Sequence, residues 1–162
     1  MSWRTRDPRI VQEECLPSRK VVYIEEGVTR FLNVDLDIYS NEPLDSLVAA
    51  FGNRVLVAYL GREKRSYSTH LSLARYPRRT SDAILGLTAL VERLPRGARR
   101  LWNQAKAKIF NVGIQGGLTP QSTEFPVSKA AMDALARVGG SITLTVYAAE
   151  VPKRRRTVKG SS

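Results

Sequence analysis

"RFLNVDLDIYSNEPLDSLVAAFG", residues 30–52, decides the fold, because two different hydrophobic periods meet within it. In the first half, apolar and polar residues alternate, which is the period of a strand with one face in a core and one face in water. This pattern predicts a strand over residues 30–39 in a sheet that keeps one polar face. The apolar set is Leu32, Val34, Leu36 and Ile38, and the polar set is Asn33, Asp35 and Asp37.

The second half of this stretch is the clearest helix signal in the chain. Its apolar residues recur at i, i+3, i+4 and i+7, so they form one stripe on a helix. We expect Ser40 or Asn41 to cap the start of the helix and Gly52 to end it, with Pro43 in the first turn. The stripe consists of Leu44, Leu47, Val48 and Phe51.

The remaining segments extend the same alternation of strands and helices. Residues 54–61 are apolar on both faces, which predicts a central strand. Residues 66–74 return from it as the second strand of a hairpin, and residues 96–108 form a short basic helical turn that carries Trp102. The other predicted strands are 20–27, 108–114 and 141–150, and the other predicted helices are 80–95 and 127–140.

This order predicts an α+β fold, with a largely antiparallel sheet and about three helices packed on one face. Its βαββαβ portion, over residues 30–114, is expected to be ferredoxin-like. We expect three regions along the chain. Residues 1–20 form an extended N-terminal arm, residues 21–150 form a single domain, and residues 151–162 form a disordered basic tail.

Composition excludes several classes of protein. The chain has 162 residues, of which 43% are hydrophobic, and no stretch reaches the roughly 18 apolar residues that span a bilayer. The start of the sequence is polar and has no signal-peptide pattern, so we expect a cytoplasmic protein with no membrane partner. The single cysteine, Cys15, allows no internal disulfide and is expected to be structural or inert.

The glycines that follow residues 108–114 raise the question of a phosphate-binding loop. Such a loop needs a helix directly after the glycines, because the helix N-terminus supplies the N–H groups that hold the anion. Here about ten residues with two prolines intervene, and no lysine stands in the Walker A position after Gly117. We therefore expect Gly116 and Gly117 to supply positive φ in a turn at the end of a strand.

Two other candidate sites lie on predicted strands. Asp35 and Asp37 project from one face and together can hold a magnesium ion, but the same spacing is typical of a solvated sheet face. His70, the only histidine, shares its strand face with Ser66, Ser68 and Ser72. Residues two apart on a strand lie roughly 7 Å from each other, too far for a direct hydrogen bond. We therefore expect no catalytic residue, no metal and no cofactor.

The strongest compositional signal is basic charge. The net charge is +11, and residues 62–108 hold twelve bases against three acids, while residues 151–162 hold five bases and no acid. Arginines interleaved with Tyr76 and Trp102 can grip phosphates while bases stack on the rings. A basic face that meets an acidic protein explains the same pattern. The candidate partner surface comprises Arg75, Arg78, Arg79, Arg96, Arg99, Arg100, Lys153, Arg154, Arg155 and Arg156.

Two stretches, "LWNQAKAKIFNVGIQGG" and "VSKAAMDALARVGGSITLTVYA", resemble an uncharacterised bacterial family. In that family a helix with a tryptophan precedes a strand reading F-[DN]-[IV]-G-I, and a later helix leads to a final strand ending in T-[VL]-Y. The corresponding residues here are Trp102, Phe110, Asn111, Gly113, Ile114 and the run Leu144 to Tyr147. The likeness is best over residues 101–149, and the basic arm and tail depart from it. Some members have been suggested as immunity proteins beside bacterial toxins.

Together these observations predict a non-enzymatic protein-binding domain, which the resemblance extends to an immunity-type factor. The expected partner is another protein with an acidic surface. The alternative is a nucleic-acid-binding accessory protein that uses the basic 62–108 segment and the C-terminal tail.

Overall fold

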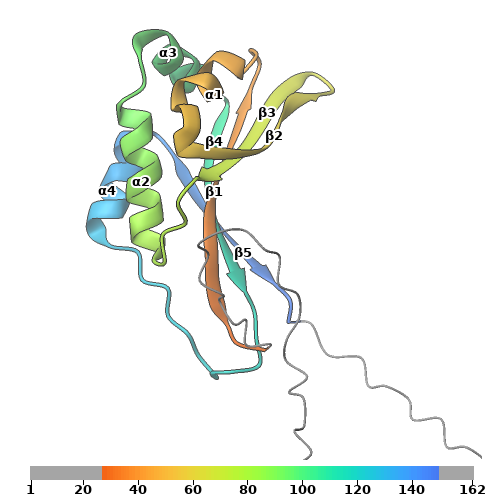
Figure 1. Ribbon diagram of the computed structural model, residues 1–162, viewed down its shortest axis with the longest axis vertical. Helices are drawn as coiled ribbons and strands as arrows, with labels where there is room; N and C mark the ends of the chain where they lie inside the picture. Colours follow the sequence, from red (N-terminus) through yellow and green to blue (C-terminus); the bar gives the residue numbers. More distant parts are fainter. Residues whose placement is uncertain (1–26, 150–162) are drawn as a thin grey trace, which may run out of the picture.

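Five strands form one open sheet, and four helices lie against it in the computed structural model, which describes residues 27–149 (Figure 1). The predicted arm at 1–20, the tail at 151–162 and nearly all of the predicted strand at 20–27 lie outside the described residues. The strands are β1 (Arg30–Ser40), β2 (Val55–Glu63), β3 (Ser66–Leu73), β4 (Ala107–Gln115) and β5 (Ser141–Tyr147). The helices are α1 (Asp45–Phe51), α2 (Thr80–Glu92), α3 (Arg96–Gln104) and α4 (Lys129–Arg137), and a 3-10 turn, η1 (Gly52–Arg54), follows α1.

The strand order across the sheet is β2-β3-β1-β4-β5. Every neighbouring pair is antiparallel except β4 and β5, which run parallel and are joined through α4. The two strand–helix–strand units are β1 to β2, through α1, and β3 to β4, through α2 and α3. They interleave, so that β3 and β1 lie side by side between β2 and β4. This is the split arrangement of a ferredoxin-like βαββαβ unit. The α+β class is therefore confirmed, and β5 is an addition at the edge of that unit.

The helices cover one face of the sheet (Figure 1). The alternation holds from Val34 to Ile38: Val34, Leu36 and Ile38 are buried beneath the helices, and the polar residues between them point to the other face. It fails at Leu32, because an irregularity between Phe31 and Asn33 places Phe31, and not Leu32, against the core. The helix stripes complete the core, because Leu47 and Phe51 of α1 and Ile84, Leu87 and Val91 of α2 are also buried. Burial of this contiguous apolar surface is the main stabilising term of the fold.

The number of helices differs from the prediction. The segment expected to form only a basic turn is α3, a nine-residue helix that begins after Pro95. Its buried side, with Ala98, Leu101 and Trp102, docks it on the core, and the Trp102 indole N–H donates to the Val138 carbonyl at 2.8 Å. Arginines stand between these positions in the sequence, and they made the apolar stripe hard to recognise.

The helix starts were predicted less well than the helix bodies. Helix α1 begins later than expected, with Leu44 at the capping position and no side-chain cap, while the Ser40 hydroxyl accepts from the Glu42 N–H in the preceding turn. Helix α2 also has no side-chain cap. Helix α4 does have a side-chain cap, because the Ser128 hydroxyl accepts from the Ala131 N–H at 3.2 Å.

Strand β2 corrects the sequence interpretation most strongly. A strand that is apolar on both faces was expected at the centre of the sheet, yet β2 is an edge strand. The β2–β3 hairpin projects beyond the helices, so the residues from Leu56 to Leu60 are all exposed (Figure 1). The apolar pattern of β2 therefore lies at the surface, where it is available for contact.

The glycines after β4 end the strand, as expected, but for a different reason. Positive φ occurs at Gly27, Gly52 and Gly139 and not at Gly116 or Gly117. A Cβ on Gly117 would collide with the backbone of residues 27–29, and the Gly116 N–H donates to the Tyr147 carbonyl at 2.8 Å. Close backbone approach, and not left-handed geometry, selects glycine here. The next helix begins only at Lys129, so no helix N-terminus lies directly behind these glycines.

Candidate functional site

The face of the sheet opposite the helices, called here the open face, carries the polar side chains of all five strands. In the pairings, Tyr39 lies opposite Ser68, Asp37 opposite His70 and Asp35 opposite Asn111. The residues that point to this face are Asn33, Asp35, Asp37 and Tyr39 of β1, Ser66, Ser68, His70 and Ser72 of β3, Leu56, Tyr59, Gly61 and Glu63 of β2, Asn111 and Gln115 of β4, and Thr143, Thr145 and Tyr147 of β5.

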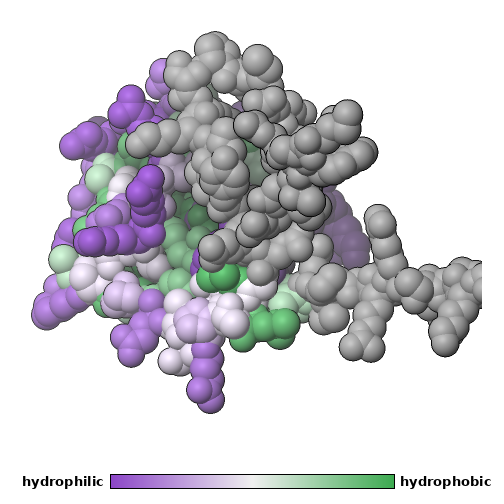
Figure 2. Space-filling view, turned by 60° about the horizontal axis from the view of Figure 1, so that its bottom comes forward, coloured by the Kyte–Doolittle hydropathy of each residue, from purple (hydrophilic) through white to green (hydrophobic). Residues whose placement is uncertain are grey.

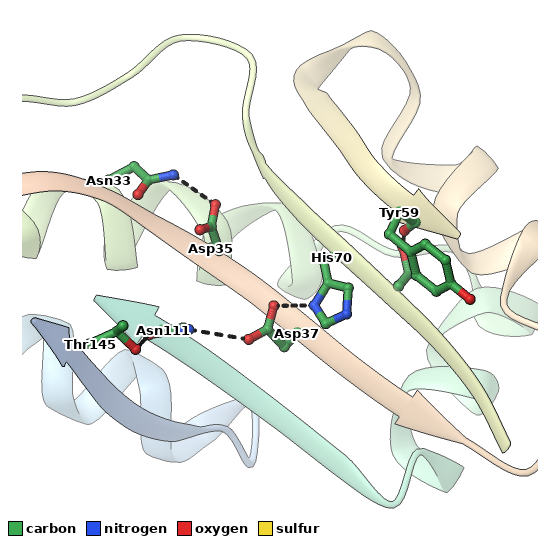
Figure 3. Close-up of polar contacts among 8 residues, drawn as sticks. Asn33, Asp35, Asp37, Tyr59, His70, Asn111 and Thr145 are labelled. Atoms are coloured by element: carbon green, nitrogen blue, oxygen red, sulfur yellow. Dashed lines mark hydrogen bonds and ion pairs between the residues drawn. The ribbon is translucent and has the colours of Figure 1, made fainter. Parts of the chain in front are cut away.

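Four of these side chains form a hydrogen-bonded row across the sheet, called here the polar row (Figure 3). The Thr145 hydroxyl donates to Asn111 Oδ1 at 2.7 Å, and Asn111 Nδ2 approaches Asp37 Oδ2 at 3.5 Å. The other Asp37 oxygen lies 2.6 Å from His70 Nδ1. Because an ionised carboxylate only accepts, Nδ1 carries the proton, and Nε2 remains for another partner. The row therefore fixes the orientation and tautomer of His70.

Aromatic rings flank the histidine. Tyr39 meets His70 edge-on, with ring centroids 6.0 Å apart, and Tyr59 tilts against it at 5.7 Å. Tyr59 also lies over Gly61, where an added Cβ would meet its hydroxyl oxygen at 2.6 Å. The side chain of Asp37 is only 13% exposed, whereas that of His70 is 33% exposed. The carboxylate thus serves as an anchor, and the imidazole is the part that a partner can reach.

Two groups on this face have shifted pKa values. Burial raises the pKa of the Asp35 carboxyl above its ordinary value of 3.8, and the neighbouring charge of Asp37 adds to the shift. A hydrogen bond from Asn33 Nδ2, at 2.7 Å, and the charge of His70 partly oppose it. Burial also raises the pKa of the Tyr39 hydroxyl, with contributions from Asp37 and Glu63. Both shifts favour the neutral form of the group.

The open face brings His70 and three serines together without joining them. Ser66, Ser68 and Ser72 share the face with His70, as the sequence indicated, but no hydrogen bond among residues 27–149 joins His70 to a serine. The Ser68 hydroxyl is buried and has no partner within that range. The same residues contain no group of three or more histidine, cysteine, aspartate or glutamate side chains placed to hold a metal ion. What the face offers is an oriented imidazole, two tyrosine rings and several hydrogen-bonding groups.

The structure separates the arginines that the sequence grouped together. Arg75, Arg78 and Arg79 lie in the loop before α2, and the arginines of α3 lie beyond its other end. A 13-residue helix is about 20 Å long, so the two groups do not form one patch. Trp102 is fully buried and cannot stack on a base, whereas Tyr76 is 59% exposed. Of the α3 arginines, Arg96 and Arg100 are exposed and Arg99 is half-buried, and Arg100 lies 3.5 Å from Glu42. Lys153, Arg154, Arg155 and Arg156 lie outside the described residues.

Sequence analysis missed a basic cluster at the tip of the β2–β3 hairpin. A shallow, open depression there is lined by Glu63, Lys64, Arg65, Ser66 and Lys106. Arg62 adds a further cation, packed 5.6 Å from the centre of the Tyr67 ring. The sequence showed a charged turn at this point, but it could not show that Lys106, which precedes β4, lies beside it. This hairpin tip borders the open face on the side of Tyr59 and Tyr39.

Apolar residues also reach the surface elsewhere. Seen from the lower end of the molecule, green apolar surface shows between purple charged side chains (Figure 2). Leu118, Leu144 and Val146 are among the most exposed large apolar residues.

Within residues 27–149, no helix is both long and apolar enough to cross a membrane. Comparison with protein-family models, curated proteins and solved structures finds no match to this chain.

Proposed function

We propose that this protein is a non-enzymatic binding domain that recognises another protein through its open face. The observation that carries the proposal is the polar row, in which Asp37 holds His70 in one orientation between Tyr39 and Tyr59. Tyrosine is enriched at the energetic centres of interfaces because a large ring buries apolar area while its hydroxyl hydrogen-bonds. Exposed Leu56 extends this surface with an apolar side chain.

The charge around the proposed contact surface indicates the kind of partner. The hairpin tip places Lys64, Arg65 and Lys106 beside a single acid, Glu63. Complementary charge at an interface rim steers association and disfavours wrong partners. We therefore propose a partner protein with an acidic surface that contacts the tyrosines and His70 and places carboxylates against the tip. The proposal includes a cytoplasmic setting and, through the family resemblance of residues 101–149, an immunity-type role.

The test compares two tyrosines that differ in position. The chain, immobilised, captures partners from a lysate of the native host, and a reproducibly captured protein is then purified and titrated by calorimetry. We expect Tyr59→Ala to raise the Kd about 30-fold, because hot-spot tyrosines contribute about 2 kcal/mol. Tyr76→Ala removes an exposed tyrosine from the loop before α2, which is not part of the open face, and should leave the Kd unchanged. Equal effects of the two variants, or the absence of any reproducible partner, would refute the proposal.

A second measurement addresses catalysis directly. The protein is assayed with generic phosphodiester, ester and nucleotide substrates, together with the variants His70→Ala and Asp35→Ala. The proposal predicts no turnover above the buffer rate. A robust rate that is lost in either variant would show that the face is an active site and that the binding proposal is wrong.

One observation favours the nucleic-acid alternative. Tyr76 is exposed in a loop that also carries Arg75, Arg78 and Arg79, so a ring for base stacking lies among exposed cations. This alternative predicts retention on single-stranded or duplex DNA at about 150 mM salt, with affinity falling steeply as salt rises. It also predicts the opposite ranking of the variants, since Tyr76→Ala would weaken retention and Tyr59→Ala would not. If neither the full chain nor a chain shortened to residues 1–152 is retained on DNA, the nucleic-acid alternative is excluded.

A further inference from the structure

The outer edge of β2 is a long and unpaired strand edge. No strand within residues 27–149 pairs with it, and from Leu56 to Leu60 every residue is exposed. Leu56 and Val57, which point to opposite faces, are 47% and 45% exposed. An unpaired edge presents a row of backbone N–H and C=O groups that can pair with another chain.

Charge and proline, two of the usual protections against such pairing, are missing from the centre of this strand. Natural edge strands carry a lysine, a proline or an inward-pointing charge, or a β-bulge, each of which discourages edge-to-edge contact. Residues 55–60, "VLVAYL", contain no charge and no proline. The one protection present is an irregularity that shifts the register between Val57 and Tyr59 against β3. The charges begin at Arg62. The strand is thus apolar in the middle and charged at its end.

The pattern of β2 is complementary to itself when the strand is reversed. Val57 and Leu60 lie opposite Leu71 and Thr69 of β3, so they point to the helix side. In an antiparallel pair of two β2 strands, the register that sets Val57 against Leu60 of the other copy also sets Leu56 against Gly61. Both of these point to the open face, so the residues of each of these two pairs match in direction. At the centre, the same register sets Ala58 against Tyr59, where the irregularity of β2 lies.

The same register brings opposite charges together at both ends. It sets Arg54, just before β2, against Glu63 of the other copy, and the two-fold relation repeats this pair. Arg54 uses two of its N–H groups on the carbonyls of Phe51 and Ala50, at 2.9 and 3.1 Å. A guanidinium has five N–H donors, so three remain for a carboxylate.

From this edge, its apolar pattern and its charge complementarity, we propose that β2 pairs antiparallel with β2 of a second copy, forming a closed two-fold dimer. The pairing is isologous, so it uses up both β2 edges and ends at two chains. The two sheets become one continuous sheet, and the two open faces lie on it side by side. A partner with two matching sites would then gain avidity. The inference does not depend on the proposed partner, because it rests on β2 alone.

Sedimentation or light scattering over a hundredfold range of concentration tests the dimer. We expect the mass to rise from that of one 18.1 kDa chain toward twice that value. Val57→Lys places a charge on the edge and should weaken dimerisation at least tenfold. Leu144→Lys is the matched control, because Leu144 is 61% exposed on the opposite edge strand, and this change should leave dimerisation unaltered. Circular dichroism confirms that both variants are folded.

Charge reversal tests the register. Glu63→Arg and Arg54→Glu should each weaken the dimer, because each sets like charges opposite one another, and the double variant should restore it. A monomer at every concentration would overturn the proposal. The proposal would also be wrong if Val57→Lys left the dimer unaffected, or if Leu144→Lys disrupted it equally. It would likewise be wrong if the double variant failed to restore the dimer, or if oligomers larger than a dimer formed. Partner capture is scored separately, so failure of the dimer leaves the proposed function to its own test.

Discussion

His70 and Asp37 lie directly opposite each other on β3 and β1, and His70 Nδ1 is 2.6 Å from Asp37 Oδ1. The two residues are 33 positions apart in the chain, and only the antiparallel register of these strands brings them together. Because the carboxylate is largely covered while the imidazole reaches the surface, the pair presents an oriented imidazole on the open face.

The first prediction concerns the energetic coupling of this pair. A double-mutant cycle with Asp37→Ala and His70→Ala should give a coupling of about 1–2 kcal/mol in urea unfolding, because the contact is short and largely screened from water. Lys129 and Asp133 provide the control, since they also lie 2.6 Å apart but are exposed on α4. Their cycle should give about 0.5 kcal/mol or less. Equal coupling in the two cycles would show that His70 and Asp37 gain nothing from their location.

The second prediction concerns Asp35 and pH. Burial raises the pKa of its carboxyl in the folded state above 3.8, so the folded protein holds this proton more tightly than the unfolded chain does. Asp35 therefore lowers stability as pH rises from about 3.8 through the raised pKa. Asp35→Asn keeps an acceptor for Asn33 and removes the buried charge. We expect the variant to unfold at a higher temperature than the wild type near neutral pH, with the difference shrinking toward zero below that window. A constant difference at all pH values would contradict this assignment.

The third prediction concerns Trp102, which the sequence placed among the nucleic-acid-binding residues. Its indole is fully buried and bonded to the Val138 carbonyl, so Trp102→Ala should cost about 3–5 kcal/mol through the cavity and the lost bond. Trp102→Phe should cost about 1–3 kcal/mol, since it leaves a buried carbonyl without its donor. Tyr76→Ala, at an exposed site in the same basic sequence segment, residues 62–108, should change stability by less than about 0.5 kcal/mol. Denaturant unfolding measures all three. A near-neutral Trp102→Ala would show that α3 is not docked as described.

The fourth prediction separates two glycines. A Cβ at Gly117 would meet the backbone of residues 27–29, so Gly117→Ala must move one chain segment and should destabilise the fold. We expect a loss of about 1–3 kcal/mol, the range typical of overpacking. Gly97 in α3 has open space around it, and Gly97→Ala should stabilise the protein by up to about 1 kcal/mol through helix propensity. Thermal unfolding of the two variants should therefore shift in opposite directions. A shift in the same direction would refute the packing argument.

Much of the fold followed from periodicity, and the site did not. The alternation from Val34 to Ile38 and the stripe of α1 predicted both element type and core face, because each pattern depends only on neighbours in sequence. The apolar pattern of β2 was wrong as a guide to position, since an exposed apolar edge strand has the same pattern in sequence as a buried strand. His70 was compared only with serines of its own strand. Its real partner, Asp37, becomes visible only once the register between β3 and β1 is known.

The basic residues show the same limit. Counting charge along the chain joined Arg75, Arg78 and Arg79 to the arginines of α3, although α2 holds the two groups apart. The count over residues 62–108 included Lys106, but the candidate surface did not, and the sheet brings this residue beside the hairpin tip. Which charges form one surface is decided by tertiary contacts, so a linear charge profile cannot give that answer.

The measurement that tests the open face most directly is NMR chemical-shift mapping with the captured partner. Unlabelled partner is added to the isotope-labelled full chain, and both backbone amides and the His70 ring are followed. We expect the largest changes at His70, Tyr39, Tyr59 and the hairpin tip, with little change at Tyr76 and in α3. Changes confined to Tyr76, its neighbouring arginines and α3, with the His70 ring unmoved, would contradict the central claim that this sheet face is where the protein binds.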